Sequence, residues 1–267
     1  ESQAAAAAGM VRLAHAYQEV LAKHNLTVAQ VLVTLDDSEN RRRYINARNT
    51  LETLLKFGAV PLINENDTIA TDEIRFGDND RLAARVAAMI GADLLILLSD
   101  VDGLYSANPI YNKSAKHLAI IDHINDEVMA MAGTANAQYA SGGMVTKLEA
   151  ARISTAAGCH MVICDGRAPE PLAKLETGAR CSCFLATKSK HAARKQWIAG
   201  ALTPRGTIRV DSGAAVALRK GKSLLPAGVL AVKGQFDRGD LIAVEDPLGK
   251  IIGHGLSSYG ASDTTKI

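Results

Sequence analysis

Two short polar motifs in the first third of the chain could together bind a small charged molecule. Residues 63–67 read INEND and follow an apolar run, and residues 77–80 read GDND and precede a helical pattern. Polar side chains at the carboxyl end of a parallel strand lie where open α/β proteins bind their ligands. Amide groups in such motifs can bind a carboxylate or an α-amino group, and Asp67 could pair with an ammonium.

The GDND motif also stands at the start of an expected helix. The exposed N–H groups and the dipole of a helix start favour an anion. The simpler interpretation is that Asp78 or Asn79 only caps the helix. Because the two motifs lie at the two ends of one connecting loop, the sequence favours a binding site over capping alone.

A third candidate is the segment LLSDVDGLY at residues 97–105. Ser99 and Asp100 end an apolar, strand-like run. At the carboxyl edge of a sheet these two side chains could line a nucleotide pocket, and the loop at residues 106–109 would continue around it. The alternative interpretation is a turn followed by a helix cap.

The segment SGGMVTK at residues 141–147 is a glycine turn that leads into a helix. Such a turn lets backbone N–H groups approach phosphates, while Lys147 supplies a point charge. The spacing of a Walker loop is absent. Glycine turns before helices are common, so this motif alone is a weak signal for phosphate binding.

The elements that must position these motifs alternate between helical and strand-like patterns over the first 200 residues. The strands are apolar runs without alternation, which is typical of parallel strands covered by helices on both faces. The pattern therefore predicts an α/β fold with a mostly parallel central sheet flanked by helices. The expected helices and the strands that follow them are 4–23 and 29–35, 41–57 and 60–63, 80–90 and 93–98, and 145–157 and 160–164.

The last 60 or so residues show a different pattern, with short strands separated by turn signals. This pattern predicts a second, small β-barrel domain over residues 205–267, after a first domain over residues 1–200. Since the chain begins inside a helix with no strand before it, we expect the opening part of the first fold to be missing. The expected strands of the second domain are 206–210, 230–233, 240–244 and 250–253.

Composition excludes several classes of protein. With 48% hydrophobic and 22% charged residues over 267 positions, the chain can form packed cores and is not disordered as a whole. Apolar runs are too short for a membrane helix, and the start of the chain does not resemble a secretory leader. The four cysteines fit reduced thiols better than a disulfide framework or a zinc site. These features predict a cytoplasmic protein.

The four motifs, taken in this order and spacing, resemble the amino acid kinase family, and within it the branch that phosphorylates glutamate. The tail, with GKSLLPAG at residues 221–228, resembles the PUA domain that follows many such kinases. The resemblance covers nearly the whole chain, and the combination is far more specific than any single motif. It implies an amino acid kinase fold followed by a small β-barrel PUA-like domain.

The resemblance also implies a reaction. Members of this branch are transferases that use ATP and Mg²⁺ to phosphorylate the side-chain carboxylate of L-glutamate. The product is L-glutamyl 5-phosphate, and the reaction is the first step of proline biosynthesis. Feedback inhibition by proline and a homo-oligomer, either a dimer or a tetramer, are further expectations from the family.

Site residues follow from the same resemblance. Asp67 and Asn79 would hold L-glutamate, and Ser99 and Asp100 would contact ATP. Asp80 would orient the phosphate-binding lysines, which gives it a catalytic role together with Lys147; no residue is assigned to a metal. The segment that would wrap the nucleotide phosphates consists of Ser141, Gly142, Gly143, Met144, Val145, Thr146 and Lys147.

The family also carries a lysine on a first strand, a neighbouring glycine-rich loop, and a serine near the glutamate pocket. All three would lie upstream of residue 1, so Lys147 is the one phosphate-binding lysine that can be named. We expect little or no kinase activity from residues 1–267 alone, because half of the phosphate site would be absent.

Two alternatives remain open from the sequence. One is another amino acid kinase that acts on aspartate or N-acetylglutamate. The other is an RNA-binding or RNA-modifying protein that uses the PUA-like tail, whose net charge from Arg205 onward is +3. RNA binding is possible but not favoured, because a strong footprint would show clustered basic residues and a high domain charge. The INEND and GDND motifs have no obvious task in a protein that binds RNA.

Overall fold

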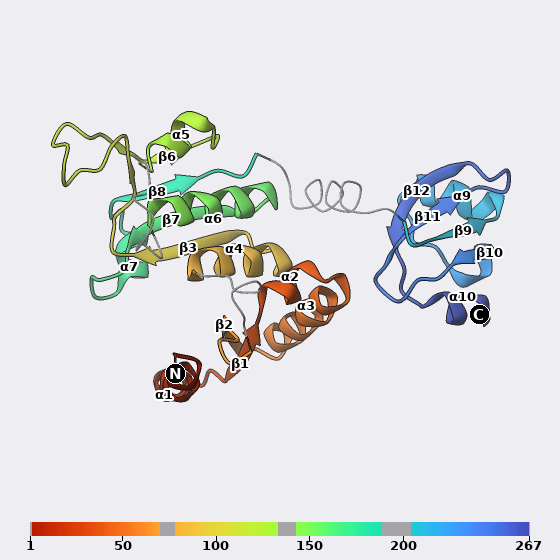
Figure 1. Cartoon of the computed structure of the whole chain (residues 1–267), viewed down its shortest axis with the longest axis horizontal. Helices are drawn as coiled ribbons and strands as arrows, with labels where there is room; N and C mark the ends of the chain where they lie inside the picture. The colour runs from red at the N-terminus through yellow and green to blue at the C-terminus, as the bar shows by residue number, and fades with distance from the viewer. Residues whose placement is uncertain (1, 70–77, 133–142, 188–203, 267) are drawn as a thin grey trace. The chain divides into compact units, whose positions relative to one another are not determined.

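The structure is a computed structural model that describes residues 2–69, 78–132, 143–187 and 204–266. The chain divides into two compact units, Glu1–Ala193 and Arg194–Ile267, and each is described by itself. Figure 1 shows the elements of both units in chain order. Among the described residues, no helix combines the length and the apolar character that a membrane crossing needs.

The first unit is built from alternating helices and strands, as the sequence pattern predicts. Its helices are α1 (Ser2–Ala22), α2 (Leu35–Glu39), α3 (Arg41–Lys56), α4 (Asn79–Ile90), α5 (Asp126–Ala130), α6 (Met144–Ala156) and α7 (Pro171–Glu176). Its strands are β1 (Val28–Val33), β2 (Val60–Glu65), β3 (Leu94–Ser99), β4 (Leu104–Tyr105), β5 (His117–Leu118), β6 (Ile120–Ile121), β7 (His160–Asp165) and β8 (Cys181–Phe184).

Parallel pairing dominates where the sequence predicts it. β1 pairs with β2, and β3 pairs with β7 in a register that sets Ser99 opposite Asp165. β3 and β7 belong to a sheet of order β3-β7-β8-β6, in which β8 runs antiparallel to β7 and parallel to β6. A further pair, β4 and β5, is antiparallel. β8 was not among the strands paired with a preceding helix, although the residues around Cys181 and Cys183 are strand-like in the sequence.

Two strands extend further into the polar motifs than the sequence predicts. β2 continues through Asn64 and Glu65, because these residues keep pairing with Leu32 and Val33 of β1. β3 likewise includes Ser99 as its last residue. The sequence placed these strand ends too early because the residues there are polar. The true ends are set by pairing with a segment that is distant in the sequence.

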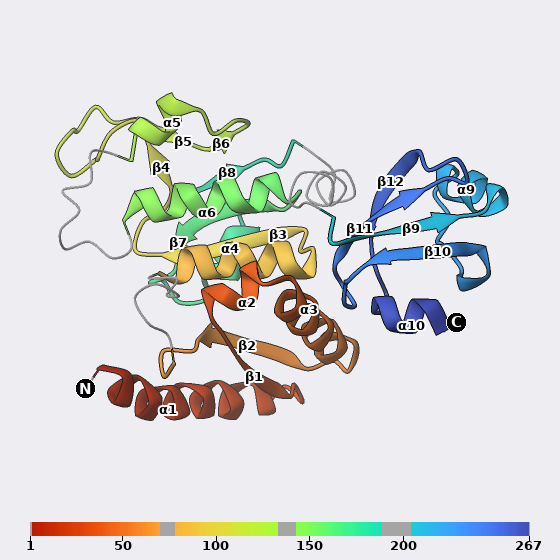
Figure 2. The same cartoon turned by 45° about the vertical axis from the view of Figure 1, so that its right-hand side comes forward.

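The core of the first unit lies between the sheet and the helices α4 and α6. Leu148, Met161, Ile163 and Phe184 are completely buried in it. Helices α4 and α6 pack against each other beside β3 and β7, as Figure 2 shows. Fully buried alanines lie on both helices, and such small side chains allow two helix backbones to approach closely. They are Ala84, Ala150 and Ala151.

The second unit contains a four-stranded mixed sheet of order β10-β9-β11-β12. β9 runs antiparallel to β10 and parallel to β11, and β11 runs antiparallel to β12. A Cβ atom on Gly206 would lie 2.6 Å from the carbonyl oxygen of Lys233, so only glycine fits there. The elements are β9 (Gly206–Val210), α9 (Ser212–Arg219), a 3₁₀ turn (Pro226–Gly228), β10 (Val229–Gly234), β11 (Leu241–Glu245), β12 (Ile251–Leu256) and α10 (Ala261–Lys266).

All four strands expected in the tail are present, with ends shifted by a few residues. Helix α9, which follows β9, was not predicted. The sequence predicts a small β-barrel, and the described residues form the mixed sheet with α9 and α10 beside it (Figure 1). The core of this unit includes Ile208, Val210, Phe236 and Val244.

We predict that Ala151→Leu weakens the packing of α6 in the core of the first unit. The added atoms have no room beside a completely buried methyl group, and overpacking of this kind costs about 1–3 kcal/mol. The free energy of unfolding, measured by urea denaturation, should fall by that amount. Ala156→Leu is the matched control, because Ala156 is exposed on the same helix and its change should be close to neutral. Equal stability of the two variants would contradict this packing argument.

Candidate functional site

The carboxyl ends of the strands and the starts of two helices provide most of the polar groups of the candidate site. β3 and β7 end side by side, since their register pairs Ser99 with Asp165. Helices α4 and α6 meet at their first turns, where Asp80 contacts Lys147. This arrangement agrees with the expectation that ligands of open α/β sheets bind at the carboxyl edge.

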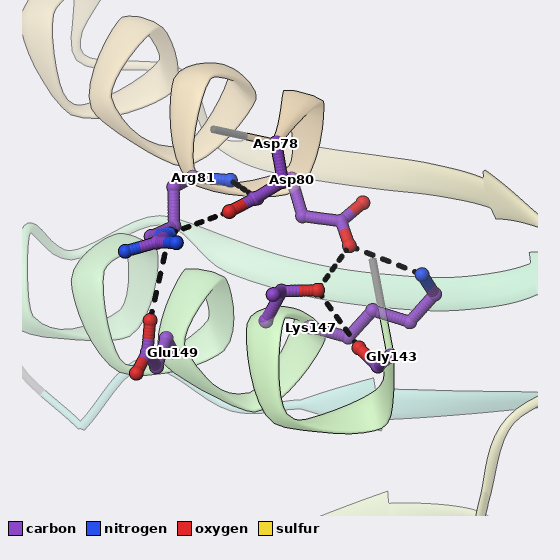
Figure 3. A network of polar contacts seen from close by, with 7 residues as sticks. Asp78, Asp80, Arg81, Gly143, Lys147 and Glu149 are labelled. Atoms are coloured by element: carbon purple, nitrogen blue, oxygen red, sulfur yellow. Dashed lines mark hydrogen bonds and ion pairs between the residues drawn. The ribbon is translucent and has the colours of Figure 1, made fainter. Parts of the chain in front are cut away.

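The ion pair between Asp80 and Lys147 is the centre of the site (Figure 3). The Nζ atom of Lys147 lies 3.0 Å from Oδ2 of Asp80, although the two residues are 67 positions apart. The side chain of Lys147 is only 9% exposed, and that of Asp80 is 19% exposed. A buried ammonium needs a hydrogen-bonded partner of opposite charge, and Asp80 provides it.

Thr146 is the second group that Asp80 holds. Its hydroxyl lies 3.0 Å from Oδ2 of Asp80 and 2.7 Å from the carbonyl oxygen of Gly143. A hydroxyl has one proton to donate, so these two acceptors share it. Asp80 therefore fixes two neighbouring side chains of the first turn of α6 at once.

The start of α6 has the properties of an anion site. Gly143 is its N-cap, with extended backbone angles and no side chain to cap the helix. Met144 and Val145 begin the helix, and the first N–H groups of a helix have no intrahelical acceptor. Lys147 adds a positive charge one turn further on. Backbone N–H groups, helix dipole and ammonium thus favour the same kind of ligand.

The INEND and GDND motifs meet at one cavity. Asn64 of β2 and Asn79 of α4 both line it, and its volume is about 510 Å³. Apolar side chains from α1, α4, β2 and β3 form most of the wall, which does not suit a charged amino acid. The polar groups of its lining are Asn64, Asn79, Gln30 and the hydroxyl of Tyr17, and these are the groups that a polar ligand could contact. Asp67 lies half-buried in the turn that follows β2.

Ser99 and Asp100 lie together at the end of β3. The hydroxyl of Ser99 donates to Oδ1 of Asp100 at 3.1 Å, and the Asp100 side chain is exposed. The backbone N–H of Gly166 donates to the carbonyl oxygen of Ser99 at 2.8 Å. A Cβ atom on Gly166 would lie 2.7 Å from Cβ of Leu98, so glycine permits this close approach of the ends of β3 and β7.

The segment after Asp100 forms a turn into β4, and the helix of the alternative interpretation does not follow it. The turn is held by Ser182, a completely buried residue of β8 whose Oγ accepts from the N–H of Leu104 at 2.7 Å. Tyr105 donates to Asp102 at 3.0 Å and accepts from Arg180 at 3.1 Å. The loop beside the proposed nucleotide residues is thus anchored to β8.

Sequence reasoning missed a second pair of charged residues at this edge. The Nε and Nη2 atoms of Arg167 each lie 3.0 Å from an oxygen of Asp165. The hydrogen bonds from the Arg167 side chain and backbone lower the pKa of Asp165 to about 2. The signal was present, because Asp165 follows an apolar run in the same way as Asp100 does.

Asp78 and Arg81 were also not assigned to the site. Asp78 is the N-cap of α4 and accepts from the backbone N–H of Arg81 at 2.8 Å, so the capping interpretation is confirmed for this residue. Its side chain is only 5% exposed. Gly77, Ser141 and Gly142 lie outside the described residues, and the predicted phosphate segment is therefore described from Gly143 onward.

The two parts of the sequence match two known families. The amino acid kinase family matches residues 1–165, more than half of the chain. The chain belongs to the amino acid kinase family. The PUA domain family matches residues 206–267, so the predicted kinase fold with a PUA-like domain after it is confirmed.

Curated members of the family are similar to the whole chain. A protein named glutamate 5-kinase from Paramagnetospirillum magneticum is 58% identical over 267 residues, which is 100% of this chain and 72% of that protein. Another of that name from Jannaschia sp. is 60% identical with the same coverage. The predicted resemblance to the glutamate-phosphorylating branch is confirmed by these relatives.

Solved structures show a weaker similarity. The UMP kinase of Bacillus anthracis matches with a TM-score of 0.46 and 15% identity, covering 67% of each chain. A PUA domain from Aeropyrum pernix matches 23% of this chain and 34% of its own at 36% identity, with a TM-score of 0.23. Both TM-scores are too low to add to the family assignment.

We predict that Arg167→Ala raises the pKa of Asp165 from about 2 toward its ordinary value. The variant loses the side-chain hydrogen bonds and the positive charge of Arg167, which stabilise the carboxylate. A pKa that is lower in the folded protein contributes stability above the unfolded pKa, and this contribution is lost as pH falls toward 2. Asp165 should therefore contribute less to acid unfolding between about pH 4 and 2 in the variant.

Carboxyl carbon chemical shifts, followed by NMR against pH, measure this pKa directly. Arg180→Ala is the matched control, since Arg180 is also an exposed arginine at this edge but contacts Tyr105 and Asp102. It should leave the titration of Asp165 nearly unchanged. An unchanged titration in Arg167→Ala would contradict the assignment of Arg167 as the cause.

Proposed function

We propose that this protein is an ATP-dependent kinase that phosphorylates the side-chain carboxylate of L-glutamate. The product is L-glutamyl 5-phosphate, and the reaction is the first step of proline biosynthesis. Support comes from identity near 60% to glutamate 5-kinases along the whole chain. The observation that carries the chemistry is the buried pair of Asp80 and Lys147 at the start of α6, whose N-cap Gly143 has no side chain.

The reaction requires positioning more than proton transfer. A carboxylate is already a nucleophile at neutral pH and needs no general base. The protein must therefore align it with the γ-phosphoryl group and neutralise the charge that both substrates carry. Lys147 and the N–H groups of Met144 and Val145 are suited to stabilise the equatorial phosphoryl oxygens in the transition state. Their effect is largest where water is excluded, which agrees with the burial of Lys147.

Asp80 acts in this proposal by holding Lys147 and Thr146 in place. It accepts from both side chains and does not itself attack the phosphorus. Since each contact is 3.0 Å long, the ammonium is held at a defined point beside the helix start. An oxygen of the transferred phosphoryl group would become a further acceptor for that ammonium, which has three protons to donate.

The substrate-binding roles rest on chemistry and on position along the chain. Asp67, in the turn after β2, is suited to pair with the α-ammonium of L-glutamate. Asn79, exposed at the first turn of α4, is suited to bind a carboxylate through its amide N–H groups. Ser99 and Asp100 are suited to contact the nucleotide, as the family resemblance implies.

Magnesium is part of the proposal as a companion of ATP. Within the described ranges, no group of three or more histidine, cysteine, aspartate or glutamate residues could hold a metal ion. The described residues therefore do not form a magnesium site made of protein ligands alone. Magnesium in kinases, however, is bound largely through substrate phosphates and one or two carboxylates. The ion would supply charge neutralisation, and we assign no residue to it.

The remaining expectations from the family stay predictions. We propose a cytoplasmic homo-oligomer that proline inhibits, with RNA binding by the second unit possible but not favoured. For the RNA alternative, steep salt dependence of binding would be the signature. The curated relatives are named glutamate 5-kinase, which favours neither that alternative nor a kinase acting on aspartate or N-acetylglutamate.

We predict ATP-dependent formation of a hydroxamate with L-glutamate, but not with L-aspartate or N-acetylglutamate, for a protein of the full length of the curated relatives, of which this chain covers 72%. Asp67→Ala should raise KM for glutamate by about tenfold or more, because a charge-assisted contact of roughly 1.5–3 kcal/mol is lost. Asp37→Ala is a control on another aspartate of the first unit, which contacts Thr34 and Arg43. Turnover of a different acid would contradict L-glutamate as the substrate but not the membership of the kinase family. No turnover with any of the three acids would contradict the kinase function.

We predict that Lys147→Ala lowers kcat by about 100-fold or more, the size expected when one preorganised donor to a transition state is removed. Asp80→Asn should lower kcat less, because it keeps an acceptor for Lys147 but loses the charge. Lys56→Ala, an exposed lysine at the end of α3, should keep full activity. Steady-state kinetics with saturating glutamate and ATP measure all three. A normal kcat in Lys147→Ala would remove this residue from the mechanism.

A further inference from the structure

A second bridge between α4 and α6 lies directly beside the pair of Asp80 and Lys147 (Figure 3). Arg81 contacts Asp78 through its Nε atom at 2.5 Å, and the same Nε atom lies 3.5 Å from Oε2 of Glu149 on α6. Neither Arg81 nor Glu149 has a role in the reaction proposed above. Their place next to the reacting groups requires an explanation.

The contact of Arg81 with Asp78 is the stronger half of this bridge. Asp78 caps α4 with one oxygen, which accepts the backbone N–H of Arg81, and accepts the Arg81 side chain with the other. Its carboxylate is only 5% exposed, so the loss of its cation would leave a buried, uncompensated charge. The hydrogen bond that Arg81 donates to Asp78 also raises the pKa of Arg81. The start of α4 therefore depends on Arg81.

The contact of Arg81 with Glu149 extends this arrangement to α6. On α6, Glu149 follows Lys147 by two residues. On α4, Arg81 follows Asp80 directly. The two bridges thus join the same two helices at neighbouring positions. A contact of 3.5 Å between half-exposed side chains is weak by itself. It adds a polar contact between α6 and α4 to the close packing of the buried alanines in the core.

We propose that Arg81 is a positioning residue, which locks the start of α4 with Asn79 and Asp80 to α6 with Lys147, so that the two substrate ends of the site keep one fixed geometry. This inference rests on the proposed function. Arginine suits the task better than lysine, because its planar group presents several donors to two carboxylates.

The experiment compares Arg81→Gln, Glu149→Gln and the double variant in the hydroxamate assay, with thermal unfolding of each. Arg85→Gln is the matched control: Arg85 lies one turn further along α4, is similarly exposed, and pairs with Glu39 instead. We expect kcat to fall about tenfold in Arg81→Gln and about threefold in Glu149→Gln. KM values for both substrates should change by less than about threefold, and Arg85→Gln should keep normal kinetics.

The double variant gives the decisive comparison. If Glu149 acts only through Arg81, the double variant should have the kcat of Arg81→Gln alone, because interactions within one network are not additive. Losses that multiply, or an equal loss of kcat in Arg85→Gln, would overturn the inference. Arg81→Lys keeps the charge without the planar group and should recover part of the lost kcat.

Two further measurements test the role of Arg81 if Arg81→Gln does not fold or if the protein does not phosphorylate glutamate. If Arg81→Gln fails to fold, Asp78→Asn/Arg81→Gln removes the buried charge together with its partner, and it should fold but keep the low kcat; normal kcat would reject the inference. If the unaltered protein does not phosphorylate glutamate, the proposed function fails. Hydrogen exchange then still tests Arg81: amides at the starts of α4 and α6 should exchange faster in Arg81→Gln but not in Arg85→Gln. Equal protection in both would contradict the locking role.

Discussion

The buried contact between Lys147 and Asp80 is the constraint on which the geometry of the first unit depends. The ammonium of a lysine whose side chain is only 9% exposed is tolerated only beside a carboxylate that stays within hydrogen-bond distance. The two residues belong to different helices, so α4 and α6 must keep a fixed separation. The buried alanines between these helices and the apolar core under them provide that separation. The packing of the core therefore helps to set the position of the Nζ atom of Lys147, although the core lies far from the reacting atoms.

Charge balance follows the same logic at the edge of the sheet. A site that receives two anionic substrates is weakened by free carboxylates, because like charges repel most strongly where water is excluded. Basic partners for the surrounding carboxylates leave Lys147 and the helix start as the attractive features. Three carboxylates near these strand and helix ends have such partners: Asp78 with Arg81, Asp102 with Arg180, and Asp165 with Arg167.

Much of the fold could be predicted from the sequence, because apolar runs and helical spacing are local properties. The ends of β2 and β3 were placed too early, since the polar residues Asn64 and Ser99 are kept in strands by pairing with distant segments. The contact of Asp80 with Lys147 followed from family resemblance and not from spacing. Arg81 was missed because a charged residue near a helix start looks like ordinary solvated surface until its partner on another helix is known.

Gly143 has a consequence for how this site can be mapped. The groups that α6 offers to an anion are peptide N–H groups, and the cap residue contributes no side chain. Every substitution that only shortens a side chain leaves these dipoles in place. An alanine scan would find Lys147 and its aspartate, yet it would assign no effect to the helix start. This part of the site is encoded by the path of the backbone, and it can change its side chains without losing its attraction for phosphate.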